Sequence, residues 1–330
     1  QGAHAGWRPK GSLSVAYHPR RGRDPRCGRD REPADCRNAS NPCIVWALSK
    51  AAASRRPEEG IVRTLTGKRV LITGGASGIG RSRAQRFAAE GAALILVDLN
   101  DALLQQTAAE LSAGGRRVGA YAADVTDVPG IAALREKVNA EGGPIDVLVN
   151  NAGLVFGGPF LDLPLEKHLT TYRVNTMGPV SFTHVFLPDL IGRPDAHIVN
   201  VASASGYIGL PYGSTYASSK WAVIGFTESL ELELKMLGHH HVHTTLVCPS
   251  YVSTGLFDGA KPPLFTRMLT PERLANLVTR AVLSNKRAVL APWLVKVTPP
   301  LKGILPAGVF NLISGTLGAT SSMTQWKGRG

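Results

Sequence analysis

Three side chains in the second half of the sequence can together move a proton to or from an alcohol. Tyr216 and Lys220 are four residues apart, so on a helix they lie about one turn from each other on the same face. An ammonium group beside a phenol favours the phenolate and brings its pKa of about 10 towards working pH. Ser203, thirteen residues before Tyr216, can hydrogen-bond the same substrate oxygen. The trio predicts a site that interconverts an alcohol and a carbonyl, although an ordinary amphipathic helix also explains the Tyr216/Lys220 spacing.

The elements that would position these residues alternate along the chain between a short apolar run and a helical stretch. Strands are predicted over residues 68–72, 93–97, 118–122, 145–149, 244–248 and 287–291, and helices over 81–91, 102–112, 131–141 and 271–285. Thr270 is the predicted N-cap of the last helix, with Pro271 at its first position. This alternation predicts an α/β fold, a single doubly wound parallel sheet of the Rossmann type with helices on both faces.

A glycine-rich turn between the first predicted strand and helix is suited to a dinucleotide. Its glycines allow a tight turn and a close approach of the backbone to a pyrophosphate. The helix that follows points its free N–H groups at the phosphates. The predicted cofactor-binding residues of this turn are Gly74, Ser77, Gly78, Ile79 and Gly80.

A carboxylate eighteen residues past Gly80 indicates which dinucleotide is bound. Asp98 ends the second predicted strand, where it can accept both hydroxyls of the adenosine ribose and repel a 2′-phosphate. Neither Ser77 nor Leu99 supplies a cation for such a phosphate. We therefore expect NAD as the cofactor, with NADP less favoured; an exposed aspartate at a strand end is the alternative. Asp124 also lies at a predicted strand end, where it either contacts a ligand or caps the next turn.

With Asn150-Asn-Ala-Gly153 directly after the fourth predicted strand, the chain resembles the short-chain dehydrogenase/reductase family. The resemblance runs from Gly67 to about Pro292 and rests on seven motifs that occur in the family's order. These motifs are TGGASGIG (73–80), Asp98, Asp124-Val125, NNAG (150–153), Asn175, Ser203, and Tyr216 with Lys220.

The resemblance implies a role for each catalytic position. Tyr216 would be the general acid/base, while Lys220 would lower its pKa and hold the nicotinamide ribose. Ser203 would orient the substrate oxygen, and Asn175 would anchor a water that connects Lys220 to solvent. Hydride would pass between the substrate carbon and the nicotinamide. The further cofactor-binding residues implied are Asp124, Val125, Asn151, Ala152, Gly153, Tyr216, Lys220, Pro249, Val252 and Thr254.

The chain departs from a minimal family member at Ser250 and in its C-terminal extension. Ser250 stands where the family usually has glycine, so its φ must be negative or strained. An apolar loop at 256–268 falls where the family covers its substrate, and the apolar extension 293–330 resembles the retinol and 17β-hydroxysteroid dehydrogenase-like branch. We therefore predict a lipophilic steroid-, retinoid- or fatty-alcohol-like substrate, with the extension lying on or near the substrate cleft. A peripheral contact with membrane or lipid is compatible with the same segment.

The resemblance also implies a homodimer or homotetramer, and the remaining composition limits other functions. Twelve of the Lys and Arg residues but only six Asp and Glu lie in residues 1–60, so much of the net charge of +13 belongs to a tail. Residues 1–61 are predicted to be disordered, 62–292 to form the dehydrogenase domain, and no specific nucleic-acid binding is expected. Polyanion binding through this tail and a catalytically idle dinucleotide-binding regulator are the alternatives.

Cysteine and histidine usage indicates a reducing compartment and no metal site. Only Cys248 of the four cysteines lies in the predicted domain, and the apolar run 43–48 is too short to span a bilayer. We expect a cytoplasmic protein, with membrane association left open. The run 239–241 with His243 lacks an accompanying Cys or carboxylate cluster, which favours a solvated turn over a metal site.

Overall fold

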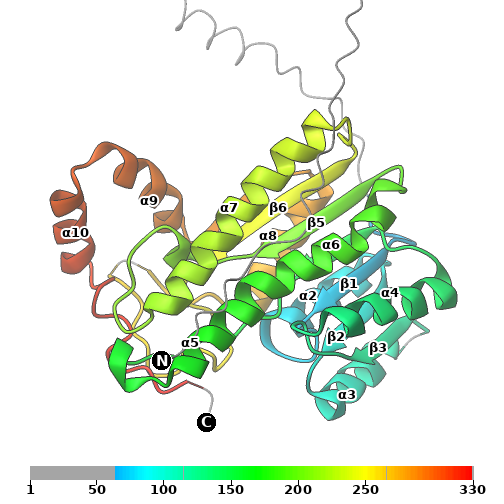
Figure 1. Cartoon of the computed structure of the whole chain (residues 1–330), viewed down its shortest axis with the longest axis horizontal. Coiled ribbons are helices and arrows are strands. Elements are labelled where there is room, and N and C mark those ends of the chain that lie inside the picture. Colours follow the sequence, from blue (N-terminus) through cyan, green and yellow to red (C-terminus); the bar gives the residue numbers. More distant parts are fainter. Residues whose placement is uncertain (1–63, 114, 265, 329–330) are drawn as a thin grey trace, which may run out of the picture. The chain divides into compact units, whose positions relative to one another are not determined.

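A computed structural model of the protein describes residues 64–113, 115–264 and 266–328, which fold around a sheet of seven parallel strands. The predicted N-terminal tail, residues 1–61, lies outside the described residues. The strand order is β3-β2-β1-β4-β5-β6-β7 (Figure 1). The strands are β1 (Arg69–Thr73), β2 (Ala93–Asp98), β3 (Val118–Ala122), β4 (Val147–Asn150), β5 (Ala196–Val201), β6 (Val242–Pro249) and β7 (Ala288–Ala291).

Helices cover both faces of this sheet, as the alternating sequence pattern predicts. One core joins strand residues such as Val70 and Ile72 to α2, α3 and α8, and the other joins Leu71 and Leu148 to α4, α6 and α7. Successive strand residues thus enter opposite cores, which explains why the central strands are apolar without interruption. The helices are α2 (Gly78–Ala89), α3 (Asp101–Ser112), α4 (Val128–Gly142), α5 (Leu165–Tyr172), α6 (Gly178–Ile191), α7 (Ser214–Met236) and α8 (Pro271–Leu283).

The predicted doubly wound fold is confirmed, and its element boundaries shift by a few residues for local reasons. Helix α2 begins three residues earlier than predicted, directly at Gly78, because the glycine turn leads straight into it. Helix α8 has Thr270 as its N-cap, whose hydroxyl accepts from the Arg273 amide at 3.2 Å. It ends at Leu283 rather than at residue 285, since Asn285 adopts a φ of 50°.

Two further helices follow β7 and form a lobe beside the sheet (Figure 1). Helix α9 (Trp293–Ile304) contains Pro299 and Pro300, and α10 (Ala307–Thr316) begins after Pro306. Val295 is the residue of α9 that enters the cluster of buried side chains around α7, β6 and Cys248. The lobe therefore joins the fold at its base.

Candidate active site

The predicted cofactor residues meet where the chain order in the sheet reverses, between β1 and β4. In open α/β sheets this switch point, at the carboxyl ends of the strands, is where ligands bind. A Cβ on Gly74 would lie 2.9 Å from Ala152 Cα, and one on Gly80 would lie 1.9 Å from the Gly74 carbonyl oxygen. Gly74 also has a φ of 64°. The turn can take this path only with glycine at both positions.

A cavity of about 920 Å³, including its open side, lies at this point. Most of the predicted cofactor residues line it together, from four different strand ends. Its lining consists of Gly74, Ser77, Gly78, Ile79, Gly80, Asp98, Leu99, Ala123, Asp124, Val125, Asn151, Ala152, Gly153, Leu154, Val174, Thr254 and Leu256. Four of the predicted cofactor residues do not line it: Pro249 ends β6, Val252 is buried in the core beneath, and Tyr216 and Lys220 belong to α7. The cradle of glycines and strand-end polar groups fits a nicotinamide dinucleotide.

Two of the cavity's acidic side chains are held by the backbone. The Asp98 carboxylate accepts from the Ala76 amide at 3.0 Å and from the Asn100 amide at 3.1 Å. Asp124 accepts from the amide and the hydroxyl of Thr126, which is the turn-capping arrangement that the sequence left open. Both carboxylates are thus fixed at the rim of the cavity.

Ser203 and Tyr216 come together on the wall of a second cavity, as the sequence predicts. Ser203 caps the short helix η3 (Ala204–Gly206), and its oxygen accepts from the Ser205 amide at 3.2 Å. Tyr216 lies in the first turn of α7 and packs edge-on against Phe257. Both residues are buried, at 8% and 5% exposure. Ser250 lines the same cavity, and its φ is not positive, so it causes no backbone strain there.

Lys220 and Asn175 are buried but do not line this second cavity. The Lys220 ammonium donates to the Val201 carbonyl at 3.0 Å and lies 5.9 Å from the centroid of the Tyr216 ring. Asn175 belongs to a π-helical turn, η2 (Arg173–Met177), that joins α5 to α6. Its amide exchanges hydrogen bonds of 2.9 Å with the backbone of Leu154. These contacts tie the segment after β4 to the helix that carries Asn175.

Burial dominates the ionisation of the two predicted catalytic groups. It raises the pKa of Tyr216 above the ordinary value, against the lowering effect of the Ser203 hydrogen bond. Burial is also the main reason why the pKa of Lys220 is lowered to about 8; Cys248 raises this pKa and the charge of Arg83 lowers it, both to a smaller extent. In the protein alone the phenol is therefore harder to ionise, which differs from the lowered pKa expected from the sequence.

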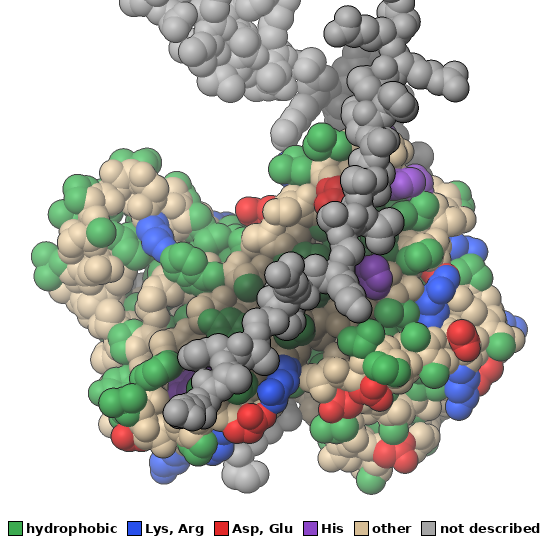
Figure 2. Space-filling view, viewed as in Figure 1, with side chains coloured by type: hydrophobic (Ala, Val, Ile, Leu, Met, Phe, Trp, Pro, Cys, Tyr) green, Lys and Arg blue, Asp and Glu red, His purple; other side chains and the backbone are tan. Residues whose placement is uncertain are grey.

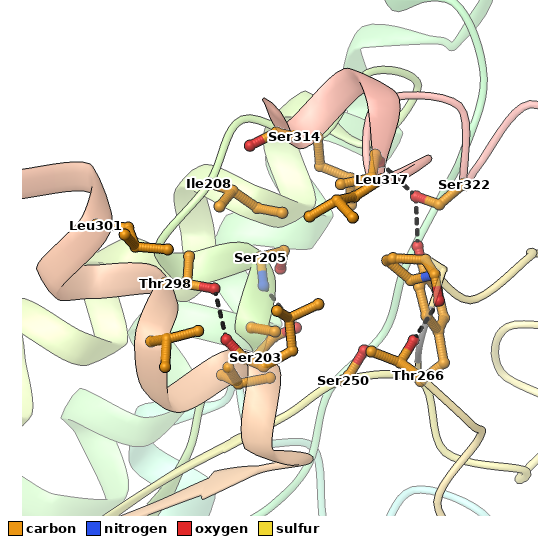
Figure 3. A pocket seen from close by; sticks show the side chains of 18 of the residues that line it. Ser203, Ser205, Ile208, Ser250, Thr266, Thr298, Leu301, Ser314, Leu317 and Ser322 are labelled. Carbon is orange, nitrogen blue, oxygen red and sulfur yellow. Dashed lines mark hydrogen bonds between the residues drawn. The ribbon is translucent and has the colours of Figure 1, made fainter. Parts of the chain in front are cut away.

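The second cavity has a volume of about 980 Å³, including its open side, and most of its lining is apolar. Figure 3 shows Ser203, Ser205 and Ser250 facing Thr298 and Leu301 of α9 and the end of α10. The lobe contributes the residues Leu294, Val295, Val297, Thr298, Leu301, Leu305, Phe310, Ile313 and Ser314. On the other side, the Tyr251 hydroxyl donates to Ser322 at 2.7 Å, which joins the chain's end to the segment after β6.

Other contacts at the site could not be read from the sequence, because they join distant segments. The Lys302 ammonium lies 3.7 Å from the centroid of the Trp221 ring, so α9 is fixed against α7. The Trp221 ring nitrogen in turn donates to the Ser205 carbonyl at 2.7 Å, next to Ser203. The Trp326 ring nitrogen donates to the Leu256 carbonyl at 3.1 Å, at the start of the apolar loop 256–268. A tryptophan following the predicted catalytic lysine was the one local signal available.

Comparison with known proteins agrees with this geometry. A family model described as short chain dehydrogenase matches residues 68–263, more than half of the sequence. The chain belongs to this family. Its members are oxidoreductases that act on CH–OH groups with NAD(P).

Relatives place the chain in the retinol and 17β-hydroxysteroid dehydrogenase branch, as predicted. Short-chain dehydrogenase/reductase family 16C member 6 of Bos taurus is 34% identical over 267 residues, which cover 80% of this chain and 84% of that protein. Epidermal retinol dehydrogenase 2 of Homo sapiens is 33% identical and covers 79% of this chain and 85% of its own. Estradiol 17-beta-dehydrogenase 11 of Pongo abelii is 35% identical, covering 74% and 81%.

Solved structures show the same fold with either dinucleotide. A short chain dehydrogenase/reductase from Burkholderia phymatum in complex with NAD superposes with a TM-score of 0.67 at 29% identity, covering 73% of this chain and 94% of that chain. A metagenomic short-chain oxidoreductase in complex with NADP has a TM-score of 0.59 at 28% identity, covering 69% and 98%. Since both dinucleotides occur on this fold, the preference of this chain for NAD or NADP depends on the side chains that line its own cavity.

Proposed function

We propose that the protein interconverts a lipophilic alcohol and its carbonyl compound with NAD(H) as cofactor. The observation that carries this proposal is the position of Ser203 and Tyr216 on one wall of a largely apolar cavity, beside the glycine-lined dinucleotide cavity. The nicotinamide would supply the hydride exchange. The protein's own groups would bind the substrate oxygen, hold its proton and exclude water.

In this proposal Tyr216 is the general acid/base and Ser203 orients the substrate oxygen. Both hydroxyls are buried and adjacent, so a single substrate oxygen can be hydrogen-bonded by the two together. Lys220 acts from behind, where its ammonium stabilises negative charge on the Tyr216 oxygen and binds the nicotinamide ribose. Asn175 holds the backbone beside Gly153 in place, and its water-anchoring role remains a prediction.

The preference for NAD over NADP rests on the charges of the dinucleotide cavity. Asp98 and Asp124 line it, and no lysine or arginine does so among the described residues. A 2′-phosphate at the adenosine ribose would meet a carboxylate and no cation. The two ribose hydroxyls of NAD instead suit the Asp98 oxygens. The other residues proposed to bind the dinucleotide are those of the glycine turn, together with Val125, Asn151, Ala152, Gly153 and Thr254. Pro249 and Val252 would act indirectly, by shaping the segment after β6 that carries Thr254.

The substrate class follows from the apolar cavity and its cover. We propose that residues 293–330 form a lid unit on the 62–292 domain, since α9 and α10 supply the wall that faces Ser203. Apolar side chains of these helices would contact the hydrocarbon part of a steroid-, retinoid- or fatty-alcohol-like substrate. The names of the relatives, which include retinol and estradiol dehydrogenases, support this class.

Two surface features support the predicted partners. Apolar side chains are exposed on α5 and near the start of α6, as at Leu165 (69%) and Met177 (61%). Contact between two copies of the chain in a homodimer or homotetramer would bury these side chains.

Figure 2 shows hydrophobic side chains along the rim of the α9–α10 lobe, where Ile304 is 80% and Leu312 69% exposed. A peripheral lipid contact of a cytoplasmic protein would cover them. No helix among those described has the length and apolar character needed to cross a bilayer.

A substrate screen tests the proposal. Purified protein is incubated with NAD or NADP and with panels of steroids, retinoids, fatty alcohols and short alcohols, and the absorbance of the reduced cofactor is recorded. We expect turnover of long apolar alcohols with NAD. Binding of NADH without turnover of any substrate in either direction would support the idle-regulator alternative instead.

A further inference from the structure

Residues 151–153, directly after β4, line the dinucleotide cavity, and a buried cation lies at each end of this segment. Neither cation has a carboxylate partner among the described residues. Arg83 of α2 is completely buried and Lys220 is 4% exposed. The Arg83 guanidinium donates to the Asn151 side-chain oxygen at 3.0 Å, at one end of the segment. The Lys220 ammonium lies at the other end, where a Cβ on Gly153 would come within 3.4 Å of it.

Arg83 is the less expected of the two. Its Nε and second terminal nitrogen are buried without a hydrogen-bond partner in the described structure. Desolvation lowers its pKa to about 9, so the side chain is still charged at neutral pH. A buried, unpaired charge destabilises a fold strongly, and replacing it with an apolar side chain of similar size often stabilises the protein. Stability of the empty protein therefore gives no reason for an arginine at this position.

An anion in the adjoining cavity would compensate both charges. The cavity wall itself offers carboxylates and no lysine or arginine among the described residues, so its lining provides no cation for a pyrophosphate. Asn151 separates Arg83 from the cavity, and its amide nitrogen donates to the carbonyls of Thr73 and Gly74 in the glycine turn. Fields of buried charges act across such short polar segments because little water screens them.

We propose that Arg83 is a positioning and electrostatic residue for the cofactor: its buried charge, placed behind Asn151, favours the pyrophosphate of the bound dinucleotide. This inference rests on the proposed dinucleotide binding and adds a residue that no motif of the sequence indicated. It implies that the empty protein is destabilised by Arg83 and that the cofactor restores the loss.

Three substitutions separate the charge from the hydrogen bond and from packing. Arg83→Met removes both charge and hydrogen bond at similar length, Arg83→Gln keeps a donor to Asn151 without the charge, and Arg83→Lys keeps the charge. Dissociation constants for NADH and for ADP-ribose, which keeps the pyrophosphate but lacks the nicotinamide, are measured by fluorescence and calorimetry. Melting temperatures of the cofactor-free proteins are recorded in parallel.

We expect the Met and Gln variants to bind both ligands about tenfold more weakly, which corresponds to about 1.4 kcal/mol. The Lys variant should stay within about threefold of wild type, and the cofactor-free Met variant should melt at the same or a higher temperature. If Arg83→Met does not fold, the Gln and Lys variants decide. A Gln variant that binds like wild type, or a Lys variant as weak as the Gln variant, overturns the proposal. Wild type that binds neither ligand overturns the proposed function as well.

Discussion

Substitution of Gly80 by alanine tests whether the glycine turn is packed as tightly as the structure shows. The new Cβ would lie 1.9 Å from the Gly74 carbonyl oxygen and 2.7 Å from the Asn151 side-chain nitrogen. Since the closest obstacle is backbone, the start of α2 must move away from the turn. Overpacking of this kind costs about 1–3 kcal/mol or more.

For a domain of this size, 1 kcal/mol corresponds to about 2–4 °C in melting temperature, so Gly80→Ala should lower it by about 2–12 °C. Displacement of the helix N-terminus should also weaken NADH binding by about tenfold or more. Gly225→Ala is the matched control: Gly225 lies within α7, and nothing stands within 4 Å of its added Cβ. This variant should melt up to about 4 °C higher, because alanine is the better helix former by about 1 kcal/mol.

The assay is a thermal melt combined with a fluorescence titration of NADH on both variants and wild type. If Gly80→Ala melts within 2 °C of wild type and binds NADH equally well, the turn is not the close-packed cradle described above. A fall of the same size in both variants would show that the effect is not specific to the turn.

Three further predictions concern other parts of the site. Asp98→Ala should weaken NAD binding by about tenfold, because hydrogen bonds to the ribose are lost, and it should reduce the ratio of NAD affinity to NADP affinity. An unchanged ratio of the two Kd values would show that Asp98 does not contact the cofactor. Truncation after Pro292 should raise KM far more for long apolar alcohols than for short ones, and a folded truncated enzyme that treats both alike contradicts the lid. Between pH 8 and 10.5 the folded state binds fewer protons at Lys220, because its pKa is lowered to about 8. The free energy of unfolding of wild type should therefore rise with pH in this window relative to Lys220→Met, and parallel curves in a denaturant titration speak against the lowered pKa.

The sheet and most of the cofactor cavity could be predicted because their signals are local. Buried parallel strands are continuous apolar runs, and the turn after β1 carries its glycines within seven residues. The end of each strand then places Asp98, Asp124 and Asn151 at one edge. Ser203 and Tyr216 follow the same logic, since both lie near the carboxyl ends of strands or in the helix next to them.

The parts that escaped prediction depend on contacts between distant segments. Pro299 and Pro300 would ordinarily end a helix, yet α9 continues through both of them, and the contact of Lys302 with the Trp221 ring fixes the following turn. Lys302 on Trp221 and Ser322 on Tyr251 connect residues more than seventy positions apart. Burial of Arg83 depends on which face of α2 meets the sheet, whereas an arginine next to a glycine turn ordinarily indicates a solvent-exposed position.

The most direct test of the central claim is the turnover of Tyr216→Phe, measured beside its NADH affinity. The substitution removes only the phenol oxygen, so NADH should bind as it does to wild type while turnover falls by about a hundredfold or more. Tyr121→Phe removes a phenol oxygen from β3, outside both cavities, and should keep wild-type turnover. Turnover of Tyr216→Phe within about tenfold of wild type, or about 1.4 kcal/mol, would contradict the assignment of Tyr216 as the acid/base.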